Sequence, residues 1–174
     1  KVRVHRKNSE NWNITLINTG EETLTGGRIL RVKKYVNNEF CLTYGDGLAN
    51  VDIKKLILAH RKSKKLATMT VVQPSARFGA VLLDNKNNIR KFVEKPTGDN
   101  QWVNGGYFVL NKKIFNYLKN DQTVWEKEPL EKLSKENKLI AYKHKNFWHP
   151  MDTLRDKIYL DSLWNLKKAP WKNW

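Results

Sequence analysis

The stretch that decides the fold is Glu39–Val72, EFCLTYGDGLANVDIKKLILAHRKSKKLATMTVV. It begins with a short, nearly continuous apolar run, Phe40–Tyr44, and ends with a second apolar run, Ala67–Val72. Short apolar runs of this kind are typical of strands buried in a sheet. Between them, Asp52 is a suitable N-cap for a helix that carries apolar residues on one face, namely Ile53, Leu56, Ile57 and His60. The stretch therefore predicts a strand, a helix and a second strand.

The segment upstream extends this alternation. Asn13–Asn18 is rich in β-formers and ends at a Thr-Gly break, which predicts another strand. Thr25 is a plausible N-cap for a helix that extends to about Val36. The order from Asn13 to Val72 is then β-α-β-α-β with short loops, which favours a parallel, wound α/β sheet.

The second half of the chain follows a different pattern. Gly79–Leu83 and Ile89–Val93 flank a polar, asparagine-rich turn, which predicts a hairpin. The elements expected after it are a strand at Gly105–Leu110, helices near Lys112–Leu118 and Leu130–Lys135, a strand at Leu139–His144 and an amphipathic helix after Pro150.

Composition narrows the classes of partner. The chain has 174 residues, enough for one domain with a sizeable core, and a formal charge of +16. Most lysines fall on polar helix faces, and no zinc-finger, RRM or KH pattern occurs, so nucleic acid is not an expected partner. No 18-residue apolar run occurs, which argues against a membrane helix. The one cysteine, Cys41, lies in an apolar run and predicts a buried thiol in a reducing, cytoplasmic compartment.

Two aspartates are candidate metal ligands. Asp46 lies between Gly45 and Gly47 just beyond a predicted strand, and open α/β sheets bind ligands beyond the carboxyl ends of their strands. Asp152 precedes a predicted helix, where an N-cap is the ordinary explanation. Mg²⁺ is usually held by one or two carboxylates together with phosphates and water. An ordinary turn at Asp46 and a cap at Asp152 remain the alternatives.

Three further motifs could bind anions or hydroxyl groups. The glycine-bearing turn Thr25–Arg28 would present free N–H groups and a guanidinium to a phosphate. Glu94 and Lys95, at a strand end closed by proline, could bind a sugar hydroxyl and a phosphate, although a surface ion pair is the simpler explanation. Asn104 offers an amide before two glycines. Neither a zinc site nor a G-x-S-x-G hydrolase elbow is supported.

In combination, these motifs resemble the sugar-1-phosphate nucleotidyltransferases, over nearly the whole chain. The glycine–aspartate and E-K-P pieces are common to the wider superfamily, whereas the W-x-P-M-D-T-L-R-D piece and the A-P-W-K tail are similar to its cytidylyl branch. The stretches that carry the resemblance are Trp12–Gly20, Thr25–Arg28, Thr43–Gly47, Arg77–Ala80, Phe92–Pro96, Asn104–Gly106, Trp125–Leu130, Phe147–Lys157 and Ala169–Lys172.

The resemblance implies a Rossmann-like wound mixed sheet in a single domain, residues 1–174, and a Mg²⁺-dependent reaction. CTP and α-D-glucose 1-phosphate would give CDP-glucose and pyrophosphate, and a homo-oligomer is expected. Carried over position by position, the resemblance implies Mg²⁺ ligands at Asp46 and Asp152, nucleotide or substrate contacts at Thr23, Arg28 and Gly45, and a sugar-phosphate pocket at Gly79, Glu94, Lys95 and Asn104. Asp46, Asp152 and Arg28 would be the catalytic set.

One part of the family pattern is not found. The glycine-rich G-G-x-G-T-R loop and the P-K-P lysine that bind the nucleotide do not occur in this sequence. We therefore expect the chain to be the carboxyl-terminal portion of such an enzyme, preceded by roughly two β-α units of ~30 residues each, and inactive by itself. Use of UTP or dTTP remains an alternative, as does a basic, non-catalytic module that binds nucleic acid or another anionic polymer.

Overall fold

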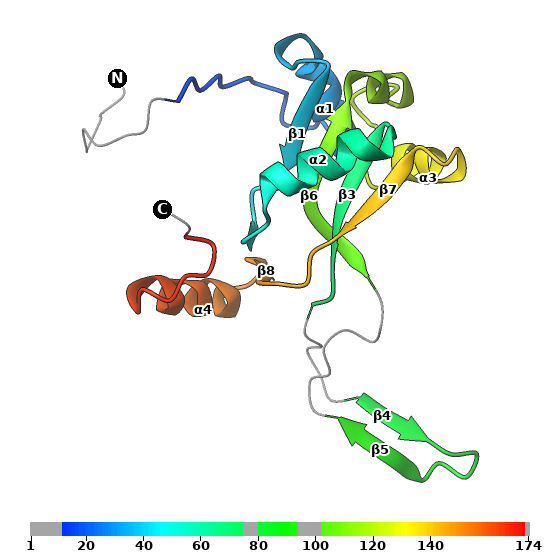
Figure 1. The fold of residues 1–174 in the computed structure, drawn as a ribbon, viewed down its shortest axis with the longest axis vertical. Coiled ribbons are helices and arrows are strands. Elements are labelled where there is room, and N and C mark those ends of the chain that lie inside the picture. Colours follow the sequence, from blue (N-terminus) through cyan, green and yellow to red (C-terminus); the bar gives the residue numbers. More distant parts are fainter. Residues whose placement is uncertain (1–11, 75–79, 94–101, 173–174) are drawn as a thin grey trace.

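The computed structural model describes residues 12–74, 80–93 and 102–172, and its centre is a four-stranded mixed sheet (Figure 1). The strand order is β1-β6-β3-β7. β6 pairs antiparallel with both β1 and β3, whereas β3 and β7 pair in parallel. The strands are β1 Glu39–Thr43, β3 Ala67–Val72, β6 Val103–Asn111 and β7 Leu139–Lys143.

Helices cover both faces of this sheet. Successive residues of a strand point to opposite faces, so Val109 packs with Val51 and Leu56 on the side of α2. Phe108 and Leu110 point to the other face, into the larger core cluster. That cluster is closed by α1, η2 and α3. The helical segments are α1 Thr25–Arg31, η1 Lys33–Tyr35, α2 Ile53–Ser63, η2 Lys112–Tyr117 and α3 Glu128–Lys135.

Two smaller pairs of strands lie outside the central sheet. β2 (Gly47–Ala49) pairs antiparallel with β8 (Trp148–Pro150), which leads into α4 (Leu154–Asn165). β4 (Ala80–Leu83) and β5 (Ile89–Val93) form a separate hairpin that projects from the central sheet (Figure 1). Within the described ranges, no helix is long and apolar enough to cross a bilayer.

Most of the elements predicted from local pattern are confirmed. Asp52 caps α2 as expected, because its carboxylate accepts a hydrogen bond from the backbone N–H of Lys55 at 2.9 Å. The predicted strands at β1, β3, β6 and β7, the hairpin and the helix after Pro150 are all present. The expected mixed sheet is present as well.

The order of the strands in the sheet differs from their order along the chain. β1 and β3 run in the same direction, but they are not neighbours, because β6 lies between them and pairs antiparallel with each. A β-α-β alternation indicates the direction of its two strands. It does not exclude that a later strand of the chain is inserted between them.

Three local predictions are wrong. Residues 13–18 form no strand, since a strand needs a hydrogen-bonded neighbour and none of the described strands pairs with them. Cys41 is exposed, and it lies on β1, the strand at one edge of the described four-stranded sheet. The N-cap of α1 is Leu24, and the Thr25 hydroxyl instead accepts from the backbone N–H of Trp125 at 3.0 Å.

The two glycines of α1 serve close packing. The backbone N–H groups of Gly26 and Gly27 donate to the carbonyl of Thr123 at 2.9 and 3.2 Å, which draws the helix against the loop at residues 121–123. A Cβ atom on Gly27 would lie 2.5 Å from the carbonyl oxygen of Asp121. Real side chains do not approach backbone so closely, so this position admits only glycine without a shift of the helix.

We therefore expect Gly27→Ala to destabilise the fold. Inside an exposed helix, alanine would stabilise by up to ~1 kcal/mol, but overpacking against backbone typically costs about 1–3 kcal/mol. Denaturant unfolding of the two proteins would measure the net loss. Gly45→Ala is the matched control, because a Cβ atom there meets no other group within 4 Å. Equal stabilities for the two variants would contradict the packing role of Gly27.

Candidate functional site

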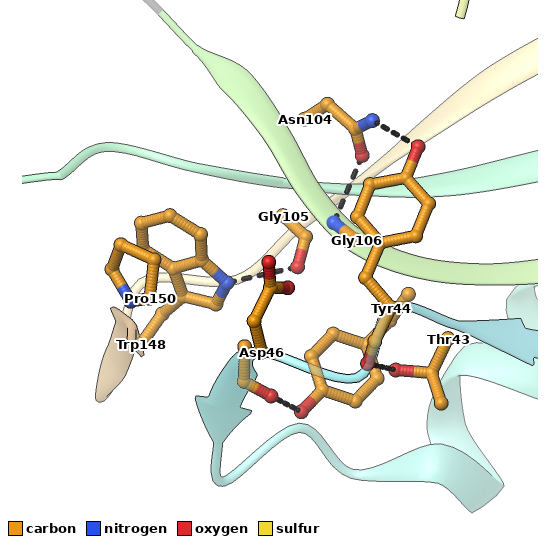
Figure 2. A pocket seen from close by; sticks show the side chains of 10 residues that line it. Thr43, Tyr44, Asp46, Asn104, Gly105, Gly106, Trp148 and Pro150 are labelled. Carbon is orange, nitrogen blue, oxygen red and sulfur yellow. Dashed lines mark hydrogen bonds between the residues drawn. The ribbon is translucent and has the colours of Figure 1, made fainter. Parts of the chain in front are cut away.

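A pocket opens where the end of β1 meets the beginning of β6. Because the two strands are antiparallel, Thr43 pairs with Tyr107, and the backbone N–H of Tyr44 donates to the carbonyl of Gly106 at 3.0 Å. The pocket is lined by residues 43–47 apart from Gly45, by residues 104–107 and by two residues of β8, Trp148 and Pro150. Figure 2 shows that these residues come from three segments far apart in the sequence.

Asp46 is the carboxylate of this pocket. Its side chain is exposed and points toward the segment that carries Gly105 and Gly106 (Figure 2). The backbone at this point is held by its neighbours: the N–H of Met151 donates to the carbonyl of Asp46 at 2.7 Å, and the Tyr107 hydroxyl donates to the carbonyl of Gly47 at 2.6 Å. These contacts hold the backbone at Asp46 in place, and the Asp46 side chain lines the pocket.

Asp152 lies shortly after β8, and β8 pairs with β2, the strand that follows Asp46. The register of β2 and β8 places Gly47 opposite Pro150, so the backbones at Asp46 and Met151 lie side by side. Asp152 is the next residue and is exposed. The structure thus brings the two segments together. The capping explanation of Asp152 is wrong, because Thr153 is the N-cap of α4 and forms a capping box with Asp156.

Trp148 forms a wall of the pocket. Its indole N–H donates to the carbonyl of Gly105 at 2.8 Å, which fixes the ring against the beginning of β6 (Figure 2). Neither Trp148 nor Tyr44 was predicted to take part in the site. Their positions in the sequence could have indicated that they lie at the site, because each aromatic residue is within four positions of a candidate aspartate.

Asn104 lies in the pocket with a defined amide orientation. Its Oδ1 accepts from the backbone N–H of Gly106 at 2.9 Å, and its Nδ2 donates to the Tyr44 hydroxyl at 3.1 Å. Gly106 has a φ of +79°, and a Cβ atom there would lie 3.0 Å from the Tyr44 ring. Burial, followed by a hydrogen bond to Glu126, raises the pKa of the Tyr44 hydroxyl, so Tyr44 remains protonated.

The prediction of free N–H groups at the Thr25–Arg28 turn is wrong. The N–H groups of both glycines already donate to Thr123, so they are not free for a phosphate. The Arg28 guanidinium donates to the Thr19 hydroxyl at 2.7 Å and to the carbonyl of Glu21 at 2.9 Å. Thr23 is buried beneath this loop. Neither Thr23 nor Arg28 lines the pocket around Asp46.

The remaining predicted residues divide into two groups. Gly45 is exposed next to Asp46, with open space where a side chain would project. Neither Gly45 nor Gly47 has a positive φ. Gly79, Glu94 and Lys95 lie outside the described residues.

The donor set at the pocket fits a hard cation. Two carboxylates on adjacent backbone segments match the one or two protein ligands that Mg²⁺ takes alongside phosphates and water. Among residues 12–74, 80–93 and 102–172 there is no group of three or more His, Cys, Asp or Glu side chains that could hold a metal ion. Asp46 is the carboxylate that lines the pocket, and Asp152 follows on the neighbouring backbone segment.

Comparison with known proteins gives a consistent result. A family model described as nucleotidyl transferase matches residues 2–164. The chain is 48% identical to the glucose-1-phosphate cytidylyltransferase of Salmonella typhimurium over 176 residues, which is 100% of this chain and 68% of the relative. It is 41% identical to a probable glucose-1-phosphate cytidylyltransferase of Bacillus subtilis, over 95% of this chain and 65% of that protein.

Solved structures share the fold. HddC from Yersinia pseudotuberculosis matches with a TM-score of 0.65 at 23% identity, over 88% of this chain and 68% of that one. A UDP-glucose pyrophosphorylase complexed with UDP-glucose matches with a TM-score of 0.62 at 17% identity, over 87% of this chain and 65% of that one. These likenesses confirm the predicted fold class. With the family match over residues 2–164 and the identity to the Salmonella enzyme, they establish that the chain belongs to the nucleotidyl transferase family.

Proposed function

We propose that this chain serves the transfer of a cytidylyl group from CTP to α-D-glucose 1-phosphate, giving CDP-glucose and pyrophosphate. The observation that carries the proposal is the 48% identity to a glucose-1-phosphate cytidylyltransferase over the whole chain. The pocket supports it, because Asp46 and Asn104 provide a carboxylate and an amide at one opening.

The reaction does not require a strong general base. The nucleophile is a phosphate oxygen of the sugar phosphate, and a phosphomonoester has a second pKa of about 6, so this oxygen is mostly ionised at neutral pH. The protein must instead hold two anions in line and offset the charge that develops at the α-phosphorus. A pocket with a carboxylate, an amide and no histidine in its lining suits this task.

In this proposal, Asp46 and Asp152 hold Mg²⁺, which when bound supplies positive charge to the reacting phosphates. Asn104 binds the sugar phosphate, and the Trp148 indole limits the entry of water from one side. Thr23, Arg28 and Gly45 contact the nucleotide, with Arg28 exchanging its bonds to Thr19 and Glu21 for bonds to substrate.

Several further features belong to the same proposal. Gly79, Glu94 and Lys95 complete the sugar-phosphate pocket, and residues 1–174 act as part of a single nucleotidyltransferase domain. The enzyme is a cytoplasmic homo-oligomer whose partners are its two substrates and include neither nucleic acid nor a membrane. Because the chain belongs to a transferase family, we do not propose the non-catalytic basic module.

We expect Asp46→Asn to lower kcat/KM by about 10²–10³-fold in the enzyme that carries this chain, the usual effect of removing one group that stabilises the transition state. A loss of Mg²⁺ affinity should accompany it, because an amide is a weaker ligand than a carboxylate. Pyrophosphate release measured against Mg²⁺ concentration would give both values, and Asp152→Asn should behave alike.

Asp161→Asn is the control for both variants. Asp161 is exposed on α4, where its carboxylate pairs with Lys157 at 2.6 Å. An exposed ion pair of this kind contributes about 0–1 kcal/mol. Wild-type rates and Mg²⁺ dependence in Asp46→Asn would remove Asp46 from the mechanism.

We further expect CTP to be preferred over UTP and dTTP by at least about 10²-fold in kcat/KM, with glucose 1-phosphate as acceptor. Cytosine presents an amino donor where uracil and thymine present a carbonyl, and a site built for one leaves buried polar groups unpaired with the other. Pyrophosphate release with each nucleotide in turn measures the ratio. A preference for UTP or dTTP would assign the chain to another branch of the same family.

A further inference from the structure

Glu126 joins the pocket to the first helix. Its Oε1 accepts from the Tyr44 hydroxyl at 2.6 Å, and its Oε2 accepts from the Thr25 hydroxyl at 2.6 Å. Tyr44 lines the pocket, whereas Thr25 begins α1. The carboxylate thus contacts two segments that are remote from it in the sequence, and it does not itself line the pocket.

The position of Glu126 is fixed by the core. The preceding residue, Trp125, is fully buried, and its ring meets Phe108 edge to face at 5.9 Å between centroids. The Trp125 backbone N–H donates to the same Thr25 hydroxyl that donates to Glu126. Although the Glu126 side chain is exposed, its backbone is therefore held by buried neighbours.

The direction of each hydrogen bond follows from chemistry. A carboxylate only accepts, so the Tyr44 hydroxyl must donate its single proton to Glu126. The Tyr44 oxygen is then an acceptor for Asn104, which must present its nitrogen. The second contact of the amide leads to the same orientation, because the backbone N–H of Gly106 is a donor and must meet the Asn104 oxygen. Two independent contacts thus define one amide orientation.

This orientation determines what Asn104 offers to a ligand. An amide nitrogen has two N–H groups and its oxygen two lone pairs, so Asn104 retains capacity for a ligand after the contacts to Tyr44 and Gly106 are made. If the amide were reversed, donor and acceptor would exchange places in the pocket. A sugar hydroxyl or phosphate oxygen that fits one arrangement would meet the wrong group in the other.

We infer that Glu126 is a positioning residue for the sugar phosphate: through the Tyr44 hydroxyl, and together with the N–H of Gly106, it sets the direction of the Asn104 amide in the pocket. The inference rests on the proposed function, because it takes the ligand of Asn104 to be glucose 1-phosphate. A purely structural role for Glu126, as a tie between α1 and the segment before α3, would leave substrate affinity unchanged.

Glu126→Gln tests the inference with almost no change of shape. A glutamine amide can donate to the Tyr44 oxygen, which allows Tyr44 to turn its own proton toward Asn104. One of the two contacts that orient the Asn104 amide is then lost, and only the N–H of Gly106 still favours the original orientation. We expect kcat/KM for glucose 1-phosphate to fall about three- to tenfold, which corresponds to the loss of one hydrogen bond. The fall should come from a higher KM, with kcat little changed. KM for CTP should change less than twofold.

Glu136→Gln is a matched control. Glu136 accepts a hydrogen bond from the Tyr117 hydroxyl at 2.6 Å, in a pair of the same chemistry outside the Asp46 pocket. Glu136 also pairs with Lys138 at 2.7 Å, so Glu136→Gln should lower the melting temperature at least as much as Glu126→Gln does. Only Glu126→Gln should change KM for glucose 1-phosphate. Equal kinetic effects of the two variants would overturn the inference.

A double-mutant cycle gives the second test and separates an effect through Tyr44 from a general loss of structure. Tyr44→Phe removes the intermediate hydroxyl, so adding Glu126→Gln to it should produce no further rise in KM for glucose 1-phosphate. Additive losses, or a loss shared equally by CTP, would show that Glu126 does not act through Tyr44. Failure of the wild-type enzyme to release pyrophosphate from CTP would contradict the proposed function instead.

Discussion

The structure depends on the central position of strand β6. It pairs with β1 on one side and with β3 on the other, both antiparallel, and its residues alternate between the two faces of the sheet. Val109 is buried toward α2, whereas Phe108 and Leu110 are buried toward α1, η2 and α3. Because burial of large apolar side chains is the main stabilising term in folding, both halves of the core are organised by this strand.

The same constraint places the pocket. In an antiparallel pair, the end of one strand lies beside the beginning of the other, so the turn after β1 meets the first residues of β6. Asp46 and Asn104 line the same pocket for this reason. β8 then closes the opening, because its pairing with β2 brings Trp148 against Gly105. The candidate site is thus a consequence of strand pairing, and its polar groups are held by backbone contacts as much as by side chains.

A second connection runs from the core to the pocket. Trp125 is buried against Phe108, and its neighbour Glu126 reaches the Tyr44 hydroxyl that lies over the pocket. Packing therefore fixes a carboxylate that in turn fixes the hydrogen-bond donors around Asn104. The glycines of α1 contribute to this arrangement because they let the helix approach the loop at residues 121–123 that leads to Trp125.

The sequence by itself determined what depends on neighbours in the chain. The helix after Asp52, the hairpin, most of the strands and the candidate role of Asp46 could be read from local periodicity, capping and turn residues, because these reflect contacts within a few positions. The nucleotidyl transferase family could also be predicted, since motif order survives in sequence. Local pattern misled where pairing or packing decides: residues 13–18 lack a neighbouring strand, Cys41 faces outward, and the N–H groups of Gly26 and Gly27 donate to Thr123. Only the tertiary structure decided that β6 separates β1 from β3 and that Glu126 reaches Tyr44, because hydrogen bonds between remote segments leave no periodic signal in the chain.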